Sequence, residues 1–259
     1  MQTFQRVIPR PLVALALLAI PSFGSTVLID FGRHDGVQGN PTVNPDTNGH
    51  YWNNLTYNGG EFQIPSGQAY NDLVDTSNVA TTIDVTTTSI WRSNGVNNGG
   101  LLAPSAGLLG DFAIATATQD YWFTETGGSP ALNNTASLVI SGLDPGLTYD
   151  LRLFGTREST STRETQYVIQ GGNGPFSASY LTSGTGIGDG GYNGNNDEII
   201  SFSGIEPDGS GNINVTINAL QGGFAYLGVM EISSVPEPSH LAMVLGAGLV
   251  GLMRRRRQA

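Results

Sequence analysis

The sequence predicts an all-β protein, an antiparallel β-sandwich or jelly roll, with an N-terminal signal helix and a C-terminal transmembrane helix. Short segments rich in β-branched residues recur along the middle of the chain with two-residue alternation. Clusters of Gly, Asn, Asp and Pro separate them, as turns do. Helical runs do not alternate with these segments, which disfavours a parallel α/β sheet and favours an antiparallel architecture.

The predicted strands follow one another without an interdomain linker or a repeat, so residues 25–233 are expected to form one domain. Only residues 105–120 are predicted to hold a short helix. Turn-forming sequences occupy residues 171–174, 207–211 and 221–223. The predicted strands are residues 26–31, 81–88, 137–140, 148–154, 163–170, 199–202, 213–217 and 224–232.

Charge is distributed unevenly along the 259 residues, which contain no Lys and no Cys. Six of the 11 arginines lie in the two terminal segments, and of the 21 acids only Glu237 does. The body therefore sets five arginines against 20 acids, a net charge near −15. Such a field repels phosphate backbones, so nucleic acid is not an expected partner, whereas cations and neutral glycans are tolerated. The absence of Cys excludes disulfides and thiol chemistry.

Residues 1–24 have the layout of a secretory signal peptide. Arg6 and Arg10 precede the apolar residues 12–20, and Pro21 ends that run. Small residues follow, so cleavage is expected after Gly24. A buried helix or an uncleaved anchor is the alternative, but a polar β-like sequence begins immediately afterwards.

Residues 234–259 contain three parts in a fixed order. The first is a stiff extended element, because each Pro fixes φ and biases its predecessor away from helix; it comprises Val235, Pro236, Glu237 and Pro238. An apolar run over residues 241–253 comes next, and a positive membrane stop follows it, made of Arg254, Arg255, Arg256 and Arg257. The uncharged stretch is shorter than the roughly 17–25 residues of a usual transmembrane span. A thin membrane or arginine snorkelling toward the head groups would make up the missing length. An amphipathic surface helix is the alternative.

This three-part order closely resembles the PEP-CTERM sorting signal of exported proteins from Gram-negative-type bacteria that make exopolysaccharide. The resemblance implies export through the Sec translocon, cleavage by signal peptidase, and a membrane-anchored precursor. It further implies recognition near Pro236 by an exosortase, a membrane cysteine protease–transpeptidase, and transfer to the cell surface or extracellular matrix. About 25 residues carry the match, and they say nothing of the activity of the body.

The body carries a second, more diffuse resemblance. Its motifs are VLIDFG, YWNNL, SGLDPGLTYDLRLFGTR and EPDGSGNINVTI followed by FAYLGVMEI. They are similar to galactose-binding-like jelly rolls found ahead of PEP-CTERM signals and as accessory modules of carbohydrate-active enzymes. The resemblance implies a jelly-roll fold and carbohydrate binding.

A Gly-rich loop is the candidate Ca²⁺ site. Hard Ca²⁺ prefers oxygen ligands, and glycines allow the sharp turns that bring them together. The candidate ligands are Asp189, Asn193, Asn195, Asp197 and Glu198. Their spacing does not match an EF-hand, and a solvated turn-rich loop is the alternative. A second oxygen-rich stretch occupies residues 44–49.

Aromatic residues beside polar residues form the candidate sugar-binding platform, since rings stack on sugar faces while polar groups fix orientation. These candidates are Tyr51, Trp52, Asn53, Trp91, Arg92, Tyr121 and Trp122. Packing of the same rings over the edge of the core is the alternative.

The sequence offers little for catalysis, and no residue is assigned as catalytic. The body has only His34 and His50, both expected to be solvated loop residues, and it lacks a G-x-S-x-G motif. Asp120 and the pair Asp197–Glu198 are the most suggestive acids for a glycosidase, but with 20 acids some close pair is expected by chance.

We therefore expect an exported, exosortase-processed surface or matrix protein that is not an enzyme and binds carbohydrate. A polysaccharide hydrolase using a carboxylate pair and a purely structural matrix protein are the alternatives.

Overall fold

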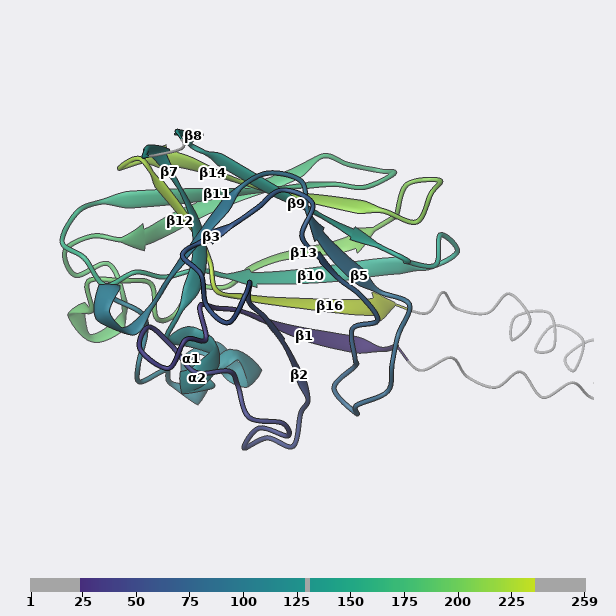
Figure 1. Ribbon diagram of the computed structural model, residues 1–259, viewed down its shortest axis with the longest axis horizontal. Coiled ribbons are helices and arrows are strands. Elements are labelled where there is room, and N and C mark those ends of the chain that lie inside the picture. Colours follow the sequence, from purple (N-terminus) through teal and green to yellow (C-terminus); the bar gives the residue numbers. More distant parts are fainter. Residues whose placement is uncertain (1–23, 129–130, 236–259) are drawn as a thin grey trace, which may run out of the picture. The chain divides into compact units, whose positions relative to one another are not determined.

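A five-stranded sheet forms around the first and last strands of the domain (Figure 1). The computed structural model describes residues 24–128 and 131–235, and Gly24–Glu237 form one compact unit. All neighbours in this sheet are antiparallel except β1 and β2, which are parallel and are joined by a long loop. In order, its strands are β13 (Ile200–Ile205), β10 (Thr148–Phe154), β16 (Val229–Val235), β1 (Thr26–Phe31) and β2 (Trp52–Leu55).

An antiparallel six-stranded sheet forms a second layer. Its strands alternate between buried and partly exposed residues, most clearly in β9, as expected where one face covers a core and the other faces outward. In order, they are β12 (Phe176–Ser183), β11 (Arg163–Gln170), β14 (Ile213–Gln221), β9 (Thr135–Ser141), β5 (Asp84–Thr87) and β4 (Ala69–Tyr70).

A third antiparallel sheet closes one end of the space between these two layers. Its order is β15 (Phe224–Leu227), β7 (Tyr121–Gly127), β6 (Trp91–Asn94) and β3 (Gln63–Ile64), and β8 (Leu132–Asn133) pairs with β7. All three sheets contribute to one hydrophobic core, which contains Leu151 from β10, Val215 from β14 and Trp122 from β7. Trp122 contacts Phe31 edge-on, with ring centroids 5.0 Å apart.

Short helices cover the outer face of the five-stranded sheet, below β1 and β16 in Figure 1. They are α1 (Ala106–Leu109), the 3-10 helix η2 (Gly110–Phe112) and α2 (Ala115–Thr118). Phe112 packs in a second core cluster with Leu28 and Trp52 of the sheet. Two further 3-10 helices, η1 (Val96–Asn98) and η3 (Asp189–Gly191), lie in loops. The helix predicted within residues 105–120 is confirmed.

The structure confirms an all-β protein with mainly antiparallel sheets, and it corrects several strand limits. The segment predicted over residues 224–232 is two strands that break at Gly228. Residues 81–83 lie outside β5, and β16 continues to Val235, two residues beyond the predicted end of the domain. The prediction missed the two-residue strands β3, β4 and β8, the longer strands β2 and β12, and the aromatic strands β6 and β7.

Most of the two predicted terminal signals lies outside the described residues. This applies to the signal peptide up to Phe23, the predicted transmembrane helix, the sorting residues Pro236, Glu237 and Pro238, and the membrane stop of Arg254, Arg255, Arg256 and Arg257. Within residues 24–128 and 131–235, no helix is both long enough and apolar enough to cross a membrane.

Candidate functional site

Burial rules out the aromatic platform that the sequence predicts. The rings of Trp52, Trp91 and Trp122 are at most 1% exposed, and Tyr121 is buried as well. Each indole N–H donates a hydrogen bond inside the protein; for example, Trp91 Nε1 lies 3.0 Å from the Ser137 carbonyl oxygen. These rings therefore pack inside the domain and present no face to a sugar. This is the alternative given by the sequence, in which the same rings pack over the core.

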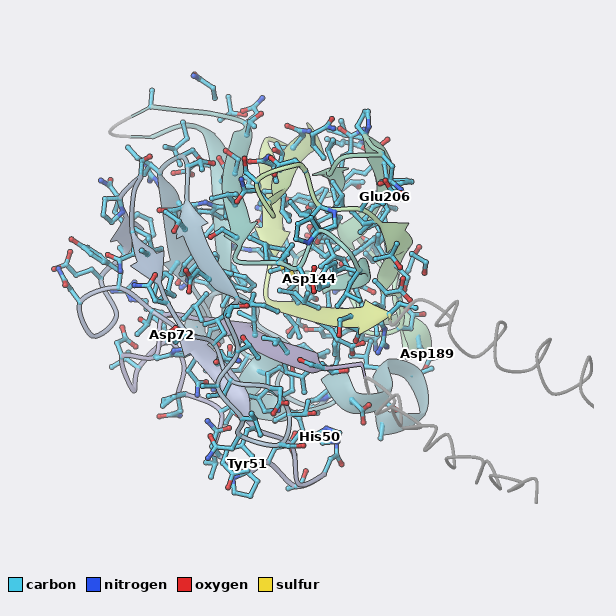
Figure 2. The ribbon with its side chains drawn as sticks, turned by 90° about the vertical axis from the view of Figure 1, so that its right-hand side faces the viewer. His50, Tyr51, Asp72, Asp144, Asp189 and Glu206 are labelled. Atoms are coloured by element: carbon cyan, nitrogen blue, oxygen red, sulfur yellow. The ribbon has the colours of Figure 1, made fainter. Side chains whose placement is uncertain are left out.

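The polar members of that platform are also structural. Arg92 is buried and forms an ion pair with Glu125. The Asn53 amide donates to the carbonyl oxygens of Leu28 and Val74 at 3.0 and 2.8 Å. Tyr51 is half-buried and lies beside His50 at the lower edge of the domain in Figure 2.

In the candidate calcium loop, amide side chains organise the backbone instead of facing a common centre. Asn195 is buried; its Oδ1 accepts from the Asp197 and Glu198 amides, and its Nδ2 donates to the carbonyl oxygens of Gly155 and Glu198. Asn193 Oδ1 accepts from the Gly186 amide.

The three acids Asp189, Asp197 and Glu198 do not form a convergent group of three ligand side chains in the described part of the chain. Burial and the neighbouring Asp197 raise the pKa of Glu198. Calcium binding by this loop therefore stays a prediction, and the three acids of the loop are not among the convergent ligand groups of the described residues.

The second oxygen-rich stretch, residues 44–49, is a closed turn. Asp46 Oδ1 accepts from the backbone amides of Asn48 and His50, and Asp46 Oδ2 accepts from Trp52 Nε1, all at 2.8 Å. These bonds use the carboxylate to hold its own loop, as Asx turns do.

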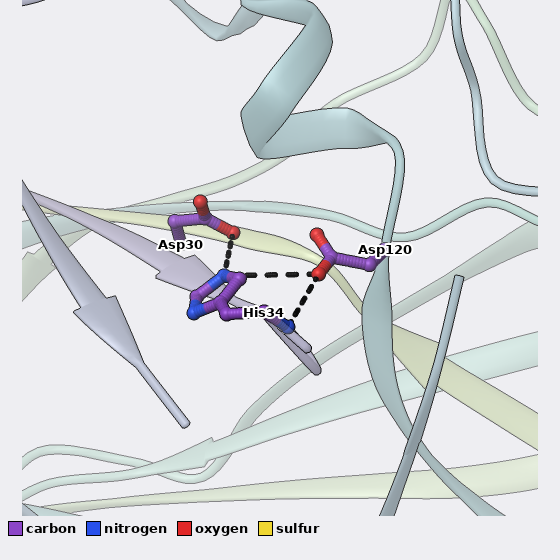
Figure 3. Close-up of side chains that lie close together, drawn as sticks. All are labelled: Asp30, His34 and Asp120. Carbon is purple, nitrogen blue, oxygen red and sulfur yellow. Dashed lines mark hydrogen bonds and ion pairs between the residues drawn. The ribbon is translucent and has the colours of Figure 1, made fainter. Parts of the chain in front are cut away.

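A different set of ligand-type side chains converges inside the domain, and Figure 3 shows it. Asp30 ends the apolar part of β1, His34 follows four residues later, and Asp120 immediately precedes β7. One potential ligand atom from each residue lies within 4.8 Å of the other two. His34 Nε2 is 3.3 Å from Asp30 Oδ1 and 3.7 Å from Asp120 Oδ2.

The backbone around the cluster is tightly constrained. His34 has a left-handed φ of 49°, which turns its ring back toward β1. A Cβ at Gly32 would lie 2.1 Å from His34 Nε2 and 2.3 Å from Asp120 Oδ2, so only glycine fits between the two side chains. A Cβ at Gly39 would lie 2.0 Å from the same Asp120 oxygen.

The cluster is almost fully enclosed: the side chain of His34 is 3% exposed and those of Asp30 and Asp120 are 0% exposed. The expectation of a solvated His34 was therefore wrong. Burial lowers the pKa of His34, but the charges of Asp30, Asp120 and Asp35 outweigh that effect and raise it overall. Burial and then the charge of Asp30 raise the pKa of Asp120 to about 8, against the opposing effects of His34 and two backbone amides.

One sequence signal could have found this cluster. Asp30 is a charged residue in the otherwise apolar and buried strand TVLIDF, and a fully buried acid requires a partner. His34 comes four residues later. Asp120 is 86 residues beyond His34, and no local pattern joins it to the other two.

A polar pocket of about 210 Å³ lies over the outer face of the five-stranded sheet. Arg152 and Glu231 are paired across β10 and β16, and Arg152 Nη1 donates to Glu231 Oε2 at 2.8 Å. The Arg152 guanidinium also lies 4.8 Å above the Phe112 ring. Two residues outside the sheet line the same pocket: His50 from the loop before β2, and Asp111 from η2. Its complete lining is Thr26, Leu28, His50, Thr76, Asp111, Arg152 and Glu231.

Comparisons with known proteins identify no family for the chain. No protein-family model matches it. No curated protein matches it either.

Several solved structures share a remote likeness with the chain. TmCBM61 in complex with β-1,4-galactotriose is 13% identical with a TM-score of 0.26, covering 55% of this chain and 83% of that one. The ANX2 ectodomain from Arabidopsis thaliana is 16% identical with a TM-score of 0.35, covering 66% and 54%. The family 32 carbohydrate-binding module of C. perfringens NanJ in complex with galactose is 18% identical with a TM-score of 0.26, covering 55% and 93%. At these TM-scores the likeness decides nothing about the ligand of this chain.

Proposed function

We propose that this chain is an exported, non-enzymatic surface or matrix protein whose β-sandwich binds neutral carbohydrate in the pocket of His50, Asp111, Arg152 and Glu231. The observation that carries the proposal is the convergence of these four groups with the hydroxyl-bearing Thr26 and Thr76 in one small pocket. Sugar hydroxyls both donate and accept hydrogen bonds, so a set of fixed carboxylate, guanidinium and imidazole groups suits them.

Two features support binding of a neutral glycan in this pocket. Arg152 is held by both Glu231 and the Phe112 ring, so little conformational entropy remains to be lost on binding. The net charge of the body, near −15, disfavours anionic polymers and leaves neutral glycans as the expected class.

A hydrolase is the alternative, because the pocket contains two carboxylates, Asp111 and Glu231. Glu231 is already engaged: its Oε2 accepts from Arg152 and its Oε1 accepts from Ser233 Oγ at 3.2 Å. Both carboxylate oxygens of Glu231 therefore already accept hydrogen bonds from the protein, which disfavours a catalytic role for Glu231.

Glycan binding is tested with a glycan array that includes the producer's own exopolysaccharide, followed by calorimetry on the full chain. Asp111 is exposed, so Asp111→Ala removes a pocket carboxylate with little effect on folding, and it is expected to weaken binding at least about tenfold. Asp189→Ala, an exposed acid outside the pocket lining, is the matched control and should bind normally. No binding to any glycan, or equal binding by Asp111→Ala, contradicts the proposal, and release of reducing ends would establish the hydrolase.

The proposed route is export through the Sec translocon, removal of the signal peptide by signal peptidase, and sorting by an exosortase-like protease from a membrane-anchored precursor. The described strands support this order. β1 begins two residues after the proposed cleavage site at Gly24 and pairs with β16, with Thr26 opposite Ser233. The first strand thus begins after the proposed cleavage site, and the last strand ends at Val235, directly before the Pro236-Glu237-Pro238 element. Mass spectrometry of the native mature protein tests the route, and an intact tail ending in Arg254, Arg255, Arg256 and Arg257 would contradict it.

A further inference from the structure

We propose that Asp30, His34 and Asp120 bind one divalent transition-metal ion, with Zn²⁺ as the expected ion, and that this ion ties the end of β1 to the start of β7. The site is separate from the carbohydrate pocket, whose lining contains none of these three residues. It also differs from the candidate calcium loop in including an imidazole nitrogen.

The first argument is distance. Zn²⁺ lies about 2.0–2.2 Å from imidazole nitrogen and carboxylate oxygen, so two ligands in a tetrahedral site are roughly 3.4 Å apart. His34 Nε2 lies 3.3 Å from Asp30 Oδ1 and 3.7 Å from Asp120 Oδ2. Both separations from His34 are thus close to the spacing that one shared ion requires, and one ligand atom from each of the three residues lies within 4.8 Å of the other two.

The second argument is the hydrogen-bond inventory of the buried atoms. Asp120 Oδ1 and His34 Nδ1 are buried and lack a hydrogen-bond partner among the described residues. His34 Nε2 and Asp30 Oδ1 are also buried, and within the described part of the chain they have only their mutual ion pair at 3.3 Å and the longer His34–Asp120 contact at 3.7 Å. Buried polar atoms are ordinarily satisfied, because leaving one without a partner costs about 1–3 kcal/mol. Two such atoms beside a buried His34–Asp30 ion pair, in one enclosed cluster, point to a ligand that all three residues share.

The third argument concerns what holds the carboxylates in place. Asp30 Oδ2 accepts from Thr42 Oγ1 at 2.8 Å, and Asp120 Oδ2 accepts from the Arg33 amide at 2.9 Å. Asp30 Oδ1 is thus left to the His34 ring, whereas Asp120 Oδ2 both accepts from backbone amides and faces His34 Nε2. Metal-binding carboxylates are oriented in the same way by neighbouring hydrogen bonds.

The chemistry of the donors selects the ion. One imidazole and two carboxylates suit Zn²⁺, whereas Ca²⁺ and Mg²⁺ prefer oxygen ligands alone. Two buried carboxylates also call for positive charge, and the Arg33 guanidinium does not supply it, because its Nε is 2.8 Å from Asp35 Oδ2 and 2.9 Å from the Gly60 carbonyl oxygen. Since the three side chains are enclosed, the ion would stabilise the fold and would not face a substrate.

The test begins with tag-free full chain, stripped with a chelator and then titrated with Zn²⁺ while Tm and bound metal are measured. We expect one equivalent of Zn²⁺ per chain and a rise in Tm that grows with free Zn²⁺, since a ligand that binds only the folded state stabilises it by mass action. Zinc-edge X-ray absorption should show one imidazole and otherwise oxygen ligands. No stoichiometric Zn²⁺, or binding of Ca²⁺ but not Zn²⁺, would overturn the proposal.

Two variants assign the site. Asp120→Asn keeps an acceptor for the Arg33 and His34 amides, and His34→Asn suits the left-handed backbone, so both are chosen to fold. Each should weaken Zn²⁺ binding at least about a hundredfold, whereas the control His50→Asn should bind as wild type does. Equal Zn²⁺ binding by wild type and both cluster variants would overturn the assignment. If neither variant folds, the absorption spectrum of the wild type decides: a shell without imidazole overturns the proposal.

Discussion

The cluster of Asp30, His34 and Asp120 and the loop from Asp189 to Glu198 both concentrate potential metal ligands, yet the structure treats them in opposite ways. In the loop, the amides of Asn193 and Asn195 are consumed by backbone hydrogen bonds. In the cluster, His34 Nδ1 and Asp120 Oδ1 are buried without a hydrogen-bond partner among the described residues, beside the buried pair of His34 Nε2 and Asp30 Oδ1. The difference teaches that unsatisfied, convergent atoms mark a candidate site better than local richness in oxygen does.

Gly32→Ala should produce the largest effect, because it breaks the cluster sterically. Its Cβ would lie 2.1 Å from His34 Nε2, and overpacking of a buried site costs about 2–3 kcal/mol of unfolding free energy. Urea unfolding measures the change. Gly209→Ala is the control, because nothing lies within 4 Å of its added Cβ and its φ is not left-handed. Equal stability of the two variants would mean that the cluster region is loosely packed.

Asn195→Ala should produce the next largest effect and tests the loop. The buried amide makes hydrogen bonds to three other residues, and its loss should lower the free energy of unfolding by about 2 kcal/mol. Chemical denaturation provides the measurement, with Asn214→Ala as an exposed control on β14. A neutral result would show that the loop does not depend on its buried amide.

Asp120→Asn in chelator-treated protein should have a smaller effect, within about 1 kcal/mol. The substitution removes an ion pair with His34 but also removes a second buried carboxylate beside Asp30, and these changes oppose each other. Thermal unfolding with and without Zn²⁺ should show wild type gaining stability from the metal while the variant does not. If the variant instead loses several kcal/mol of unfolding free energy in the presence of chelator, the folded state depends on the His34–Asp120 ion pair itself.

Asp189→Ala should produce the smallest effect, within about 0.5 kcal/mol. Asp189 is exposed, and the loop uses its backbone: the amide donates to Asn196 Oδ1 and the carbonyl accepts from the Tyr192 amide. Differential scanning calorimetry suffices for the comparison. A calorimetric Ca²⁺ titration of the two proteins after chelation tests the calcium prediction separately, since loss of the binding heat in the variant would restore the loop as a site.

Much of the fold follows from local sequence. β10 and β11 match the predicted limits because their alternating apolar residues and flanking turns are local signals, and β1 matches them because its short β-branched and apolar run is a local signal too. β6 and β7 carry no such alternation: in β7 the first four residues are all buried, because both faces of that sheet are covered. The same covering explains why Trp91 and Trp122, read as surface rings, lie in the core.

The sequence by itself determined the β architecture, the acidic body, and the order of signal-like segments at the two ends, since these depend on periodicity, composition and contiguous motifs. Only the tertiary structure decided which polar residues meet. Asp120 reaches His34 from 86 positions away because β1 and β7, from different sheets, come into contact, and Arg152 meets Glu231 from 79 positions away through the pairing of β10 with β16. Convergence of this kind depends on sheet topology and burial, and neither is encoded in any short stretch of residues.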